Sequence, residues 1–278
     1  REKGRIKRKG HPVIGDIVYD KNGNPETIPG SLKHVKAIGW HIEEFGITQI
    51  SMNLTNITET PIHTVFEEVS KKAQNRGARV TGSELVGLIP LNSILDAGKY
   101  FLKKQNRSLG IPESDIIKIA VESLGLSQVK DFEPEKNIIE YYLDRITNKG
   151  NKLVDLTVRE FSDEVFRESP APGGGSVSSY VGSLGTSLAG MVANLSCNTR
   201  GWEDKVDTFS DIAYNINKIR EELLFLVDED SNAFNKIMNA YKLPKNNDKE
   251  SKARLEAINN STLYAAEVPL RVMKKAFE

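Results

Sequence analysis

The sequence has 278 residues, enough for one large domain or for two ordinary domains that each bury a core. Its 38 basic and 38 acidic side chains balance, so no overall field indicates nucleic acid or an anionic membrane as the partner. The single cysteine, Cys197, excludes an internal disulfide and is typical of a reducing compartment such as the cytoplasm.

The first part of the chain mixes strand and helix patterns. Residues 47–54 combine β-branched side chains with partial alternation, which predicts a strand. Pro61 then suits the start of a helix that runs to about residue 75, and residues 79–89 read as a second strand closed by Pro90. This order predicts an α/β layer. Three amphipathic helices are expected next, near 91–104, 113–124 and 135–146.

A polar stretch that contains a glycine, residues 147–152, interrupts the helical pattern. We therefore expect a first domain at 1–146, a linker at 147–156 and a second domain at 157–278. After the linker the pattern predicts helices near 157–168, 176–196, 206–241 and 249–277 and no strand. The second domain is predicted to be all-α.

The loop SPAPGGGS at residues 169–176 is the most unusual segment. Its consecutive glycines, Gly173, Gly174 and Gly175, allow the backbone to approach a ligand closely. Ser176 is placed to cap the helix that follows, and the free N–H groups of a helix start attract carboxylates or phosphates. The segment is therefore either a ligand-binding loop or an ordinary interdomain loop.

The helix after this loop carries two stripes. The bulky stripe consists of Val177, Val181, Leu184, Leu188, Val192 and Leu195, and the small one of Ser178, Gly182, Gly185, Ala189 and Ala193. Glycine costs a helix about 1 kcal/mol relative to alanine, so the small stripe predicts close approach by another backbone. No charge lies between residues 168 and 200, which also fits a transmembrane span, but the serines at 176–187 argue against one.

Asp230 lies on an apolar stripe of the predicted helix at 206–241. The stripe runs Phe209, Ile212, Ile216, Ile219, Leu223, Leu226, Asp230, Ala233 and Ile237. A buried carboxylate must find a partner or keep its proton, and either state suits a general acid or base. The alternatives are that the stripe frays there or that a buried Arg or Lys pairs with the acid. Asp228 is expected to face solvent, with Asn259 and Thr262 as weak polar neighbours.

Basic residues crowd the start of the chain. Six of the first nine residues are Arg or Lys, and Lys33 and Lys36 follow. They predict either a polyanion site, for nucleic acid or a polycarboxylate tail, or a solvated loop. No nucleic-acid motif accompanies them, so no nucleic-acid partner is expected. The four histidines lack metal-ligand spacing, so neither a metal nor a catalytic histidine is expected. They are His11, His34, His41 and His63.

Two sets of motifs resemble known folate enzymes. The motifs KAIGW at 36–40, QISMN at 49–53, TGSELVGLIP at 81–90 and IIEYYL at 138–143 resemble the C-terminal subdomain of glutamate formiminotransferase. The motifs APGGGS at 171–176, LVDEDSNAF at 226–234, LPK at 243–245 and VPL at 268–270 resemble formiminotetrahydrofolate cyclodeaminase. Both occur in the order of the bifunctional formiminotransferase-cyclodeaminase family and together cover nearly the whole chain.

The resemblance implies a cytoplasmic, homo-oligomeric enzyme of histidine degradation. One activity moves the formimino group of N-formimino-L-glutamate to tetrahydrofolate, and the other closes 5-formiminotetrahydrofolate to 5,10-methenyltetrahydrofolate and releases ammonia. The family's cyclodeaminase aspartate matches Asp230, which would shuttle protons while the loop 173–176 lies near the folate. The basic segments would hold a polyglutamylated folate. No metal, nucleic acid or membrane is implied.

The chain also departs from the family. The family's transferase histidine lies in a subdomain that would precede Arg1, the helical domain is shorter than in the family, and residues 11–29 fit it loosely. The chain also lacks an initiator Met and stops within a helical pattern, so we expect it to be cut at both ends and inactive alone. The alternatives are an enzyme like methenyltetrahydrofolate cyclohydrolase and a non-catalytic folate-binding or scaffold protein.

Overall fold

The computed structural model describes residues 5–11, 14–147 and 152–278. Contacts between backbone positions divide the chain into two compact units. The first comprises Arg1–Phe101 and Ile117–Tyr142, and the second comprises Leu102–Ile116 and Leu143–Glu278. Part of the expected linker, residues 148–151, lies outside the described residues, as do residues 1–4 of the basic opening and residues 12–13 of the loosely fitting stretch.

The strands of the first unit form three antiparallel pairs. The pairs are β1 (Arg5–Ile6) with β4 (Thr27–Ile28), β2 (Arg8–Lys9) with β3 (Asp16–Ile17), and β5 (Val35–Ile42) with β6 (Ile47–Leu54). The predicted strand at 47–54 is confirmed as β6. Its partner β5 joins it through the short turn η1 (Glu43–Phe45), which ends at Gly46 with a φ of 61°.

The second predicted strand, at 79–89, is wrong. The segment is irregular and touches a turn at residues 124–125 instead: the amide of Ser83 donates to the Gly125 carbonyl at 3.0 Å and its hydroxyl to the Leu124 carbonyl at 2.6 Å. Gly87 has a φ of 88°, which breaks an extended run. Only Ile89 bridges another segment, at Ile138, so the predicted strand–helix–strand unit does not form among the described residues.

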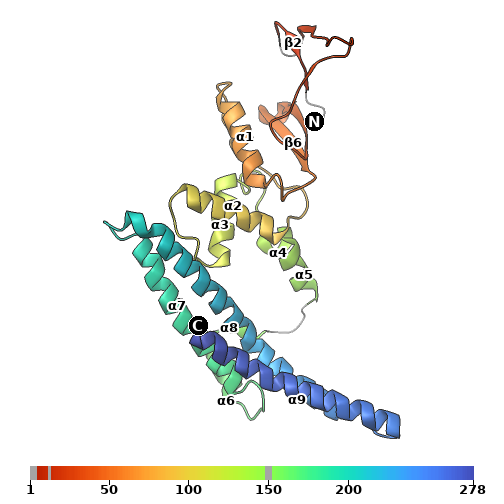
Figure 1. Cartoon of the computed structure of the whole chain (residues 1–278), viewed down its shortest axis with the longest axis vertical. Coiled ribbons are helices and arrows are strands. Elements are labelled where there is room, and N and C mark those ends of the chain that lie inside the picture. Colours follow the sequence, from red (N-terminus) through yellow and green to blue (C-terminus); the bar gives the residue numbers. More distant parts are fainter. Residues whose placement is uncertain (1–4, 12–13, 148–151) are drawn as a thin grey trace. The chain divides into compact units, whose positions relative to one another are not determined.

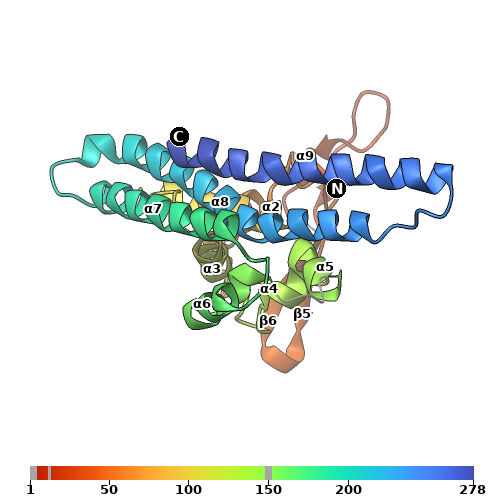
Figure 2. The same ribbon diagram turned by 90° about the horizontal axis from the view of Figure 1, so that it is seen from below.

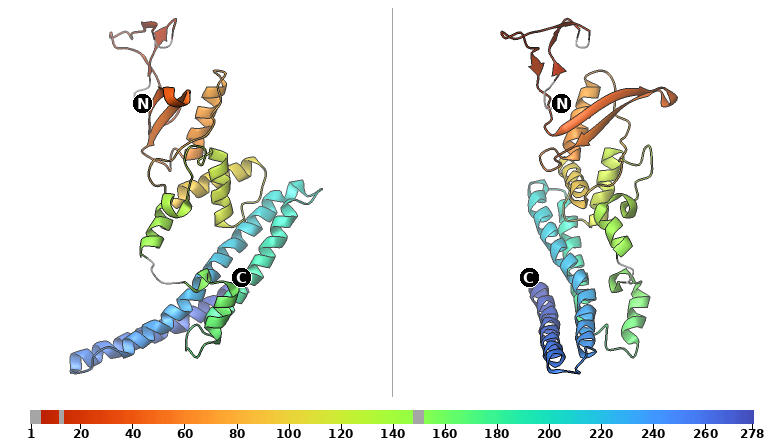
Figure 3. Two further views of the ribbon diagram at one scale, coloured as in Figure 1. Left: turned by 180° about the vertical axis from the view of Figure 1, so that it is seen from behind. Right: turned by 90° about the vertical axis from the view of Figure 1, so that its right-hand side faces the viewer.

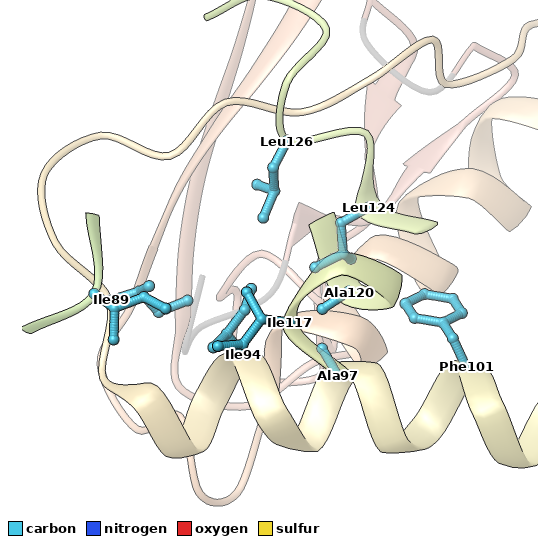
Figure 4. Close-up of a cluster of buried hydrophobic side chains, with 9 residues drawn as sticks. Ile89, Ile94, Ala97, Phe101, Ile117, Ala120, Leu124 and Leu126 are labelled. Atoms are coloured by element: carbon cyan, nitrogen blue, oxygen red, sulfur yellow. The ribbon is translucent and has the colours of Figure 1, made fainter. Parts of the chain in front are cut away.

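The helices of the first part of the chain largely follow the predicted ranges. They are α1 (Ile62–Gln74), α2 (Leu91–Lys104), α3 (Glu113–Leu124), α4 (Pro134–Asn137) and α5 (Ile139–Thr147), the last two replacing one expected helix. Figure 4 shows the core of the first unit, where Ile94, Ala97 and Phe101 of α2 face Ile117 and Ala120 of α3. Burial of these apolar faces is what fixes the two amphipathic helices.

The second part of the chain is helical. After η2 (Leu153–Asp155) come α6 (Val158–Phe166), α7 (Gly174–Cys197), η3 (Glu203–Lys205), α8 (Val206–Tyr241) and α9 (Asp248–Phe277). The described residues after 152 contain no strand, as predicted. Figures 1 and 2 show α7, α8 and α9 lying side by side, and Figure 3 shows the same arrangement from two further directions.

Helix α7 packs with the face opposite to the one its apolar pattern suggests. Five of the six members of the predicted bulky stripe are exposed: Val181, Leu184, Leu188, Val192 and Leu195. The buried residues are Ser176, Ser179, Ser183 and Ala193. The Ser179 hydroxyl, fully buried, donates to the Leu223 carbonyl of α8 at 2.6 Å. Short hydroxyl side chains let the two helices approach closely and hydrogen-bond across the contact.

Only part of the small stripe of α7 contacts another helix. A Cβ added at Gly182 would lie 3.4 Å from the Leu223 side chain, which is ordinary contact, whereas one at Gly185 would meet nothing within 4 Å. Gly185 therefore does not admit a neighbouring backbone, contrary to expectation. Among the described residues, no helix combines the length and apolarity that crossing a bilayer requires.

Candidate functional site

Asp230 lies on the packed face of α8, as the stripe predicts. Leu226 and Ala233, on the turns before and after it, are almost fully buried. They pack with Leu223 and with Val268 and Val272 of α9 in one apolar cluster. The stripe fails toward the start of α8, where Ile212 is 44% exposed. The carboxylate is therefore held at the well-packed end of the helix.

The carboxylate of Asp230 finds its partner at the start of α7. Its Oδ2 accepts from the Ser176 amide at 3.0 Å and lies 3.4 Å from the Ser176 hydroxyl oxygen. The first amides of a helix have no partner within it and carry the positive end of the helix dipole, which favours a carboxylate there. The partner of Asp230 is therefore a backbone amide and not the buried Arg or Lys that the sequence left as an alternative. Among the described residues, only Ser176 donates to this carboxylate, and only to Oδ2.

Gly175 makes this approach possible. A Cβ at this position would lie 2.1 Å from Asp230 Oδ1 and 2.4 Å from its Cγ, well inside van der Waals contact. Glycine is therefore required at this position. At Gly174 a Cβ would meet nothing within 4 Å, and at Gly173 only the Pro170 carbonyl at 3.7 Å. Of the three glycines, one explains the close approach of the acid.

Ser176 does not cap α7 as expected. The helix begins at Gly174, its N-cap is Gly173, and no side chain from the N-cap residue closes the helix. Ser176 is fully buried, and its hydroxyl donates to the Val227 carbonyl of α8 at 2.7 Å. The prediction erred because it started the helix two residues late. The capping role belongs to Asp230, from another helix.

The two acids before Asp230 each bind a different element. Asp228, expected in solvent, accepts from the amide of Leu153 at 2.6 Å and so fixes η2. Glu229 accepts from the Tyr264 hydroxyl of α9 and from Lys236 Nζ at 3.3 Å. Burial raises the pKa of Glu229, but these hydrogen bonds outweigh burial and hold it below its ordinary value. The three consecutive acids thus tie α8 to η2, α9 and α7.

Tyr264 is the polar neighbour that the sequence pattern did not identify. The expected neighbours Asn259 and Thr262 are exposed. The hydrogen bond to Glu229 raises the pKa of Tyr264, and Lys236 Nζ lies 4.1 Å from the centre of its ring. The sequence could have indicated Tyr264, because it lies one helical turn before the buried Val268 and so on the same face of α9.

The histidines belong to the first unit rather than to this site. His34 Nε2 lies 2.9 Å from a carboxylate oxygen of Glu59. His63 stacks on Tyr100 with ring centres 4.4 Å apart, and its Nδ1 is buried without a hydrogen-bond partner among the described residues. Burial lowers the pKa of His63. The sequence expectation of structural rather than catalytic roles stays a prediction for these residues.

The arrangement around Asp230 suits proton transfer. Oδ2 is anchored by the Ser176 amide, while Oδ1 has no hydrogen-bond donor among the described residues and lies against Gly175. A carboxylate with one anchored and one available oxygen can accept a proton from a ligand and return it without changing its position. The exposed Gly174 leaves the helix start open beside it.

Comparison with known proteins places these features in a family. Residues 1–144 match the formiminotransferase domain, and residues 157–278 match the family described as formiminotransferase-cyclodeaminase. The formimidoyltransferase-cyclodeaminases of Mus musculus and Gallus gallus are 36% identical over 266 residues and 38% identical over 255 residues. These alignments cover 96% and 92% of this chain but 48% and 47% of the relatives.

A third relative aligns with a smaller share of this chain. The methenyltetrahydrofolate cyclohydrolase of Methylorubrum extorquens is 35% identical over 117 residues, which is 41% of this chain and 55% of that protein. The chain thus spans about half the length of the formimidoyltransferase-cyclodeaminases it matches, in the order transferase then cyclodeaminase. It belongs to the formiminotransferase-cyclodeaminase family.

Proposed function

We propose that this chain carries the cyclodeaminase site of a folate-dependent enzyme of histidine degradation, with Asp230 as its proton-transfer residue. The observation that carries the proposal is the anchoring of Asp230 Oδ2 on the Ser176 amide beside Gly175. The reaction closes 5-formiminotetrahydrofolate to 5,10-methenyltetrahydrofolate and releases ammonia, which classes it as a lyase. The names of the relatives, formimidoyltransferase-cyclodeaminases, support this choice of substrate.

The chemistry requires one proton to move between two nitrogens. Starting from the protonated formimino group, N10 of the folate attacks the formimino carbon and forms the new carbon–nitrogen bond. Asp230 takes the proton from N10 and delivers it to the exocyclic nitrogen. The bond from carbon to that nitrogen then breaks, ammonia departs, and the positive charge stays on the methenyl bridge. Ser176 holds the carboxylate in position throughout, because its amide binds the oxygen that does not move protons.

The folate is proposed to lie over the helix start at residues 173–176. The exposed Gly174 and the neighbouring Gly173 leave room for a ligand at this end of α7. The first domain, at 1–146, would contribute to transfer of the formimino group from N-formimino-L-glutamate to tetrahydrofolate, which is the co-substrate. We further propose that residues 147–156 form a linker, that the protein is a cytoplasmic homo-oligomer, and that its folate is polyglutamylated.

A cyclohydrolase is the second candidate, because of the match to the protein of Methylorubrum extorquens. That activity would open the methenyl bridge with water instead of closing it with loss of ammonia. The match of residues 1–144 to the formiminotransferase domain favours the cyclodeaminase, since a transferase supplies its substrate.

The test measures growth of the methenyl-folate absorbance after 5-formiminotetrahydrofolate is added, in protein carrying whatever flanking sequence its gene encodes. Asp230→Asn should reduce turnover between about a hundredfold and ten-thousandfold, the usual contribution of a positioned acid or base. Folate binding, followed by fluorescence quenching, should persist because the exchange removes a proton acceptor and little volume.

Asp228→Asn is the matched control. It alters the neighbouring carboxylate, which binds the backbone of η2, and should leave turnover within a few-fold of the parent. Equal losses in both variants would assign the effect to packing and remove Asp230 from the chemistry. Turnover of 5,10-methenyltetrahydrofolate with water, and none of the formimino substrate, would put the cyclohydrolase first.

A further inference from the structure

The first unit contains an open surface cavity of about 500 Å³, and the charged residues that line it are all positive. Its walls include Arg5, Ile28, Pro29, Ala37, Lys72 and Arg76. Cavities of this size commonly hold small organic ligands. The residues converge from separate segments, namely β1, β4 and the turn after it, β5, and the end of α1. Figure 1 shows α1 beside β6.

The register of the strands explains how Arg5 reaches the cavity. Arg5 pairs with Ile28 across β1 and β4, so the cation and an apolar wall residue stand opposite each other. Lys72 lies in the last turn of α1, and Arg76 follows that helix and donates to the Lys72 carbonyl at 2.9 Å.

Basic residues at the end of a helix have an ordinary structural explanation, because they offset the negative end of the helix dipole. That explanation covers Lys72 and Arg76 but not Arg5, which comes from a strand. An acid that compensates this charge is Glu68, whose carboxylate lies 3.3 Å from Lys72 Nζ. Three cations against one carboxylate leave an excess of two positive charges at the cavity.

Three other basic residues near the start of the chain, Lys7, Arg8 and Lys33, have partners away from the cavity. Lys7 Nζ lies 2.5 Å from Glu26, and Arg8 donates to the Gly15 carbonyl at 2.7 Å. Lys33 lies 3.4 Å from Glu59. Among the described residues of the basic opening, Arg5 is the one that lines the cavity.

We propose that this cavity binds an organic polyanion. Its oxyanion groups would contact the three cations, and its apolar part would lie against the wall formed by Ile28, Pro29 and Ala37. Guanidinium groups bind carboxylates and phosphates through paired hydrogen bonds, and the lysine adds a point charge. The site lies in the first unit and does not depend on the function proposed for Asp230.

The test titrates the full chain with trimesate (a benzene tricarboxylate) and with citrate, by calorimetry at low salt. Trimesate should bind with one-to-one stoichiometry, tighter than citrate because its ring covers the apolar wall, and weaker as salt is added. Lys72→Gln and Arg5→Gln should each weaken trimesate at least about tenfold, the effect of one charge-assisted hydrogen bond.

Lys71→Gln is the matched control, since it removes the same charge from the neighbouring position of α1 without altering the cavity lining. It should change affinity by no more than about twofold, because an exposed charge outside the site contributes little. Absence of saturable trimesate binding in the folded chain, or an equal loss with Lys71→Gln, would overturn the site. Tighter binding of citrate than of trimesate would contradict the role proposed for the apolar wall. Asp230→Asn should leave this binding unchanged, which separates the two proposals.

Discussion

Gly175→Ala is the change whose effect follows most directly from the structure. The new methyl group would lie 2.1 Å from Asp230 Oδ1, so the carboxylate must move away from the Ser176 amide. Alanine in a helix gains up to about 1 kcal/mol over glycine. Loss of a hydrogen bond to a charged acceptor costs about 1.5–3 kcal/mol. We expect a net destabilisation of about 0.5–2 kcal/mol, whereas the same exchange at an unhindered glycine would stabilise the helix.

The assay is guanidinium unfolding followed by fluorescence of Trp202, in a Trp40→Phe background so that the signal comes from the second unit. Trp202 stacks on Phe209 at the start of α8, with ring centres 5.3 Å apart, and therefore reports the helical packing. Gly174→Ala is the control, because its methyl group would meet nothing within 4 Å. It should leave stability unchanged or raise it slightly.

An Asp230→Ala background separates a clash with the carboxylate from a general cost of alanine at position 175. With the carboxylate gone, the clash at Gly175 disappears, and Gly175→Ala should become neutral or stabilising. A penalty of the same size in both backgrounds would refute the idea that Asp230 is what excludes a side chain at this position.

Three further outcomes follow from the contacts. Ser179→Ala should cost about 1 kcal/mol because the Leu223 carbonyl loses its inter-helix donor, and an unchanged unfolding midpoint would contradict this. The pKa of His63 is depressed from 6.5, so the unfolded chain binds more protons than the folded chain. The free energy of unfolding should therefore fall as pH drops below about 6.5. His63→Gln should remove this pH dependence, which urea titrations at several pH values would measure. Tyr264→Phe should lower stability by about 1 kcal/mol at neutral pH. Because the pKa of Glu229 lies below its ordinary 4.5, this stabilisation is lost as pH falls through the folded value, and variant and parent should converge in acid.

The helix ranges were predictable where the apolar period was strong. Helices α2 and α8 occupy the expected residues, 91–104 and 206–241, because their patterns repeat over several turns. The strand expected at 79–89 failed because Gly87 adopts a positive φ and Ser83 bonds to a distant turn. Local pattern carries no information about such a partner.

In the candidate site, too, local features were predictable from the sequence and contacts between distant residues were not. The glycine loop and the apolar position of Asp230 could each be identified from the sequence. Their meeting could not, because Ser176 and Asp230 are 54 residues apart and touch only when α7 packs on α8. Nor could the packed face of α7, because the small stripe was expected to meet another backbone. Of that stripe only Ala193 is buried, and the other buried residues of α7 are Ser176, Ser179 and Ser183. Hydrophobicity ranks residues by transfer from water and ignores hydrogen bonds made on packing.

The serine contact between α7 and α8 gives the second unit two kinds of temperature response. Exposing apolar surface on unfolding raises the heat capacity, whereas exposing polar surface lowers it. Separation of α8 from α9, which buries Leu226, Val268 and Val272, should therefore carry a large positive heat-capacity change. Separation of α7 from α8, where three of the four buried α7 residues are serines, should carry a smaller one. Cooling should therefore weaken the α8–α9 contact more than the α7–α8 contact. The hydrogen bond from the start of α7 to Asp230 should persist at low temperatures where α9 separates from α8.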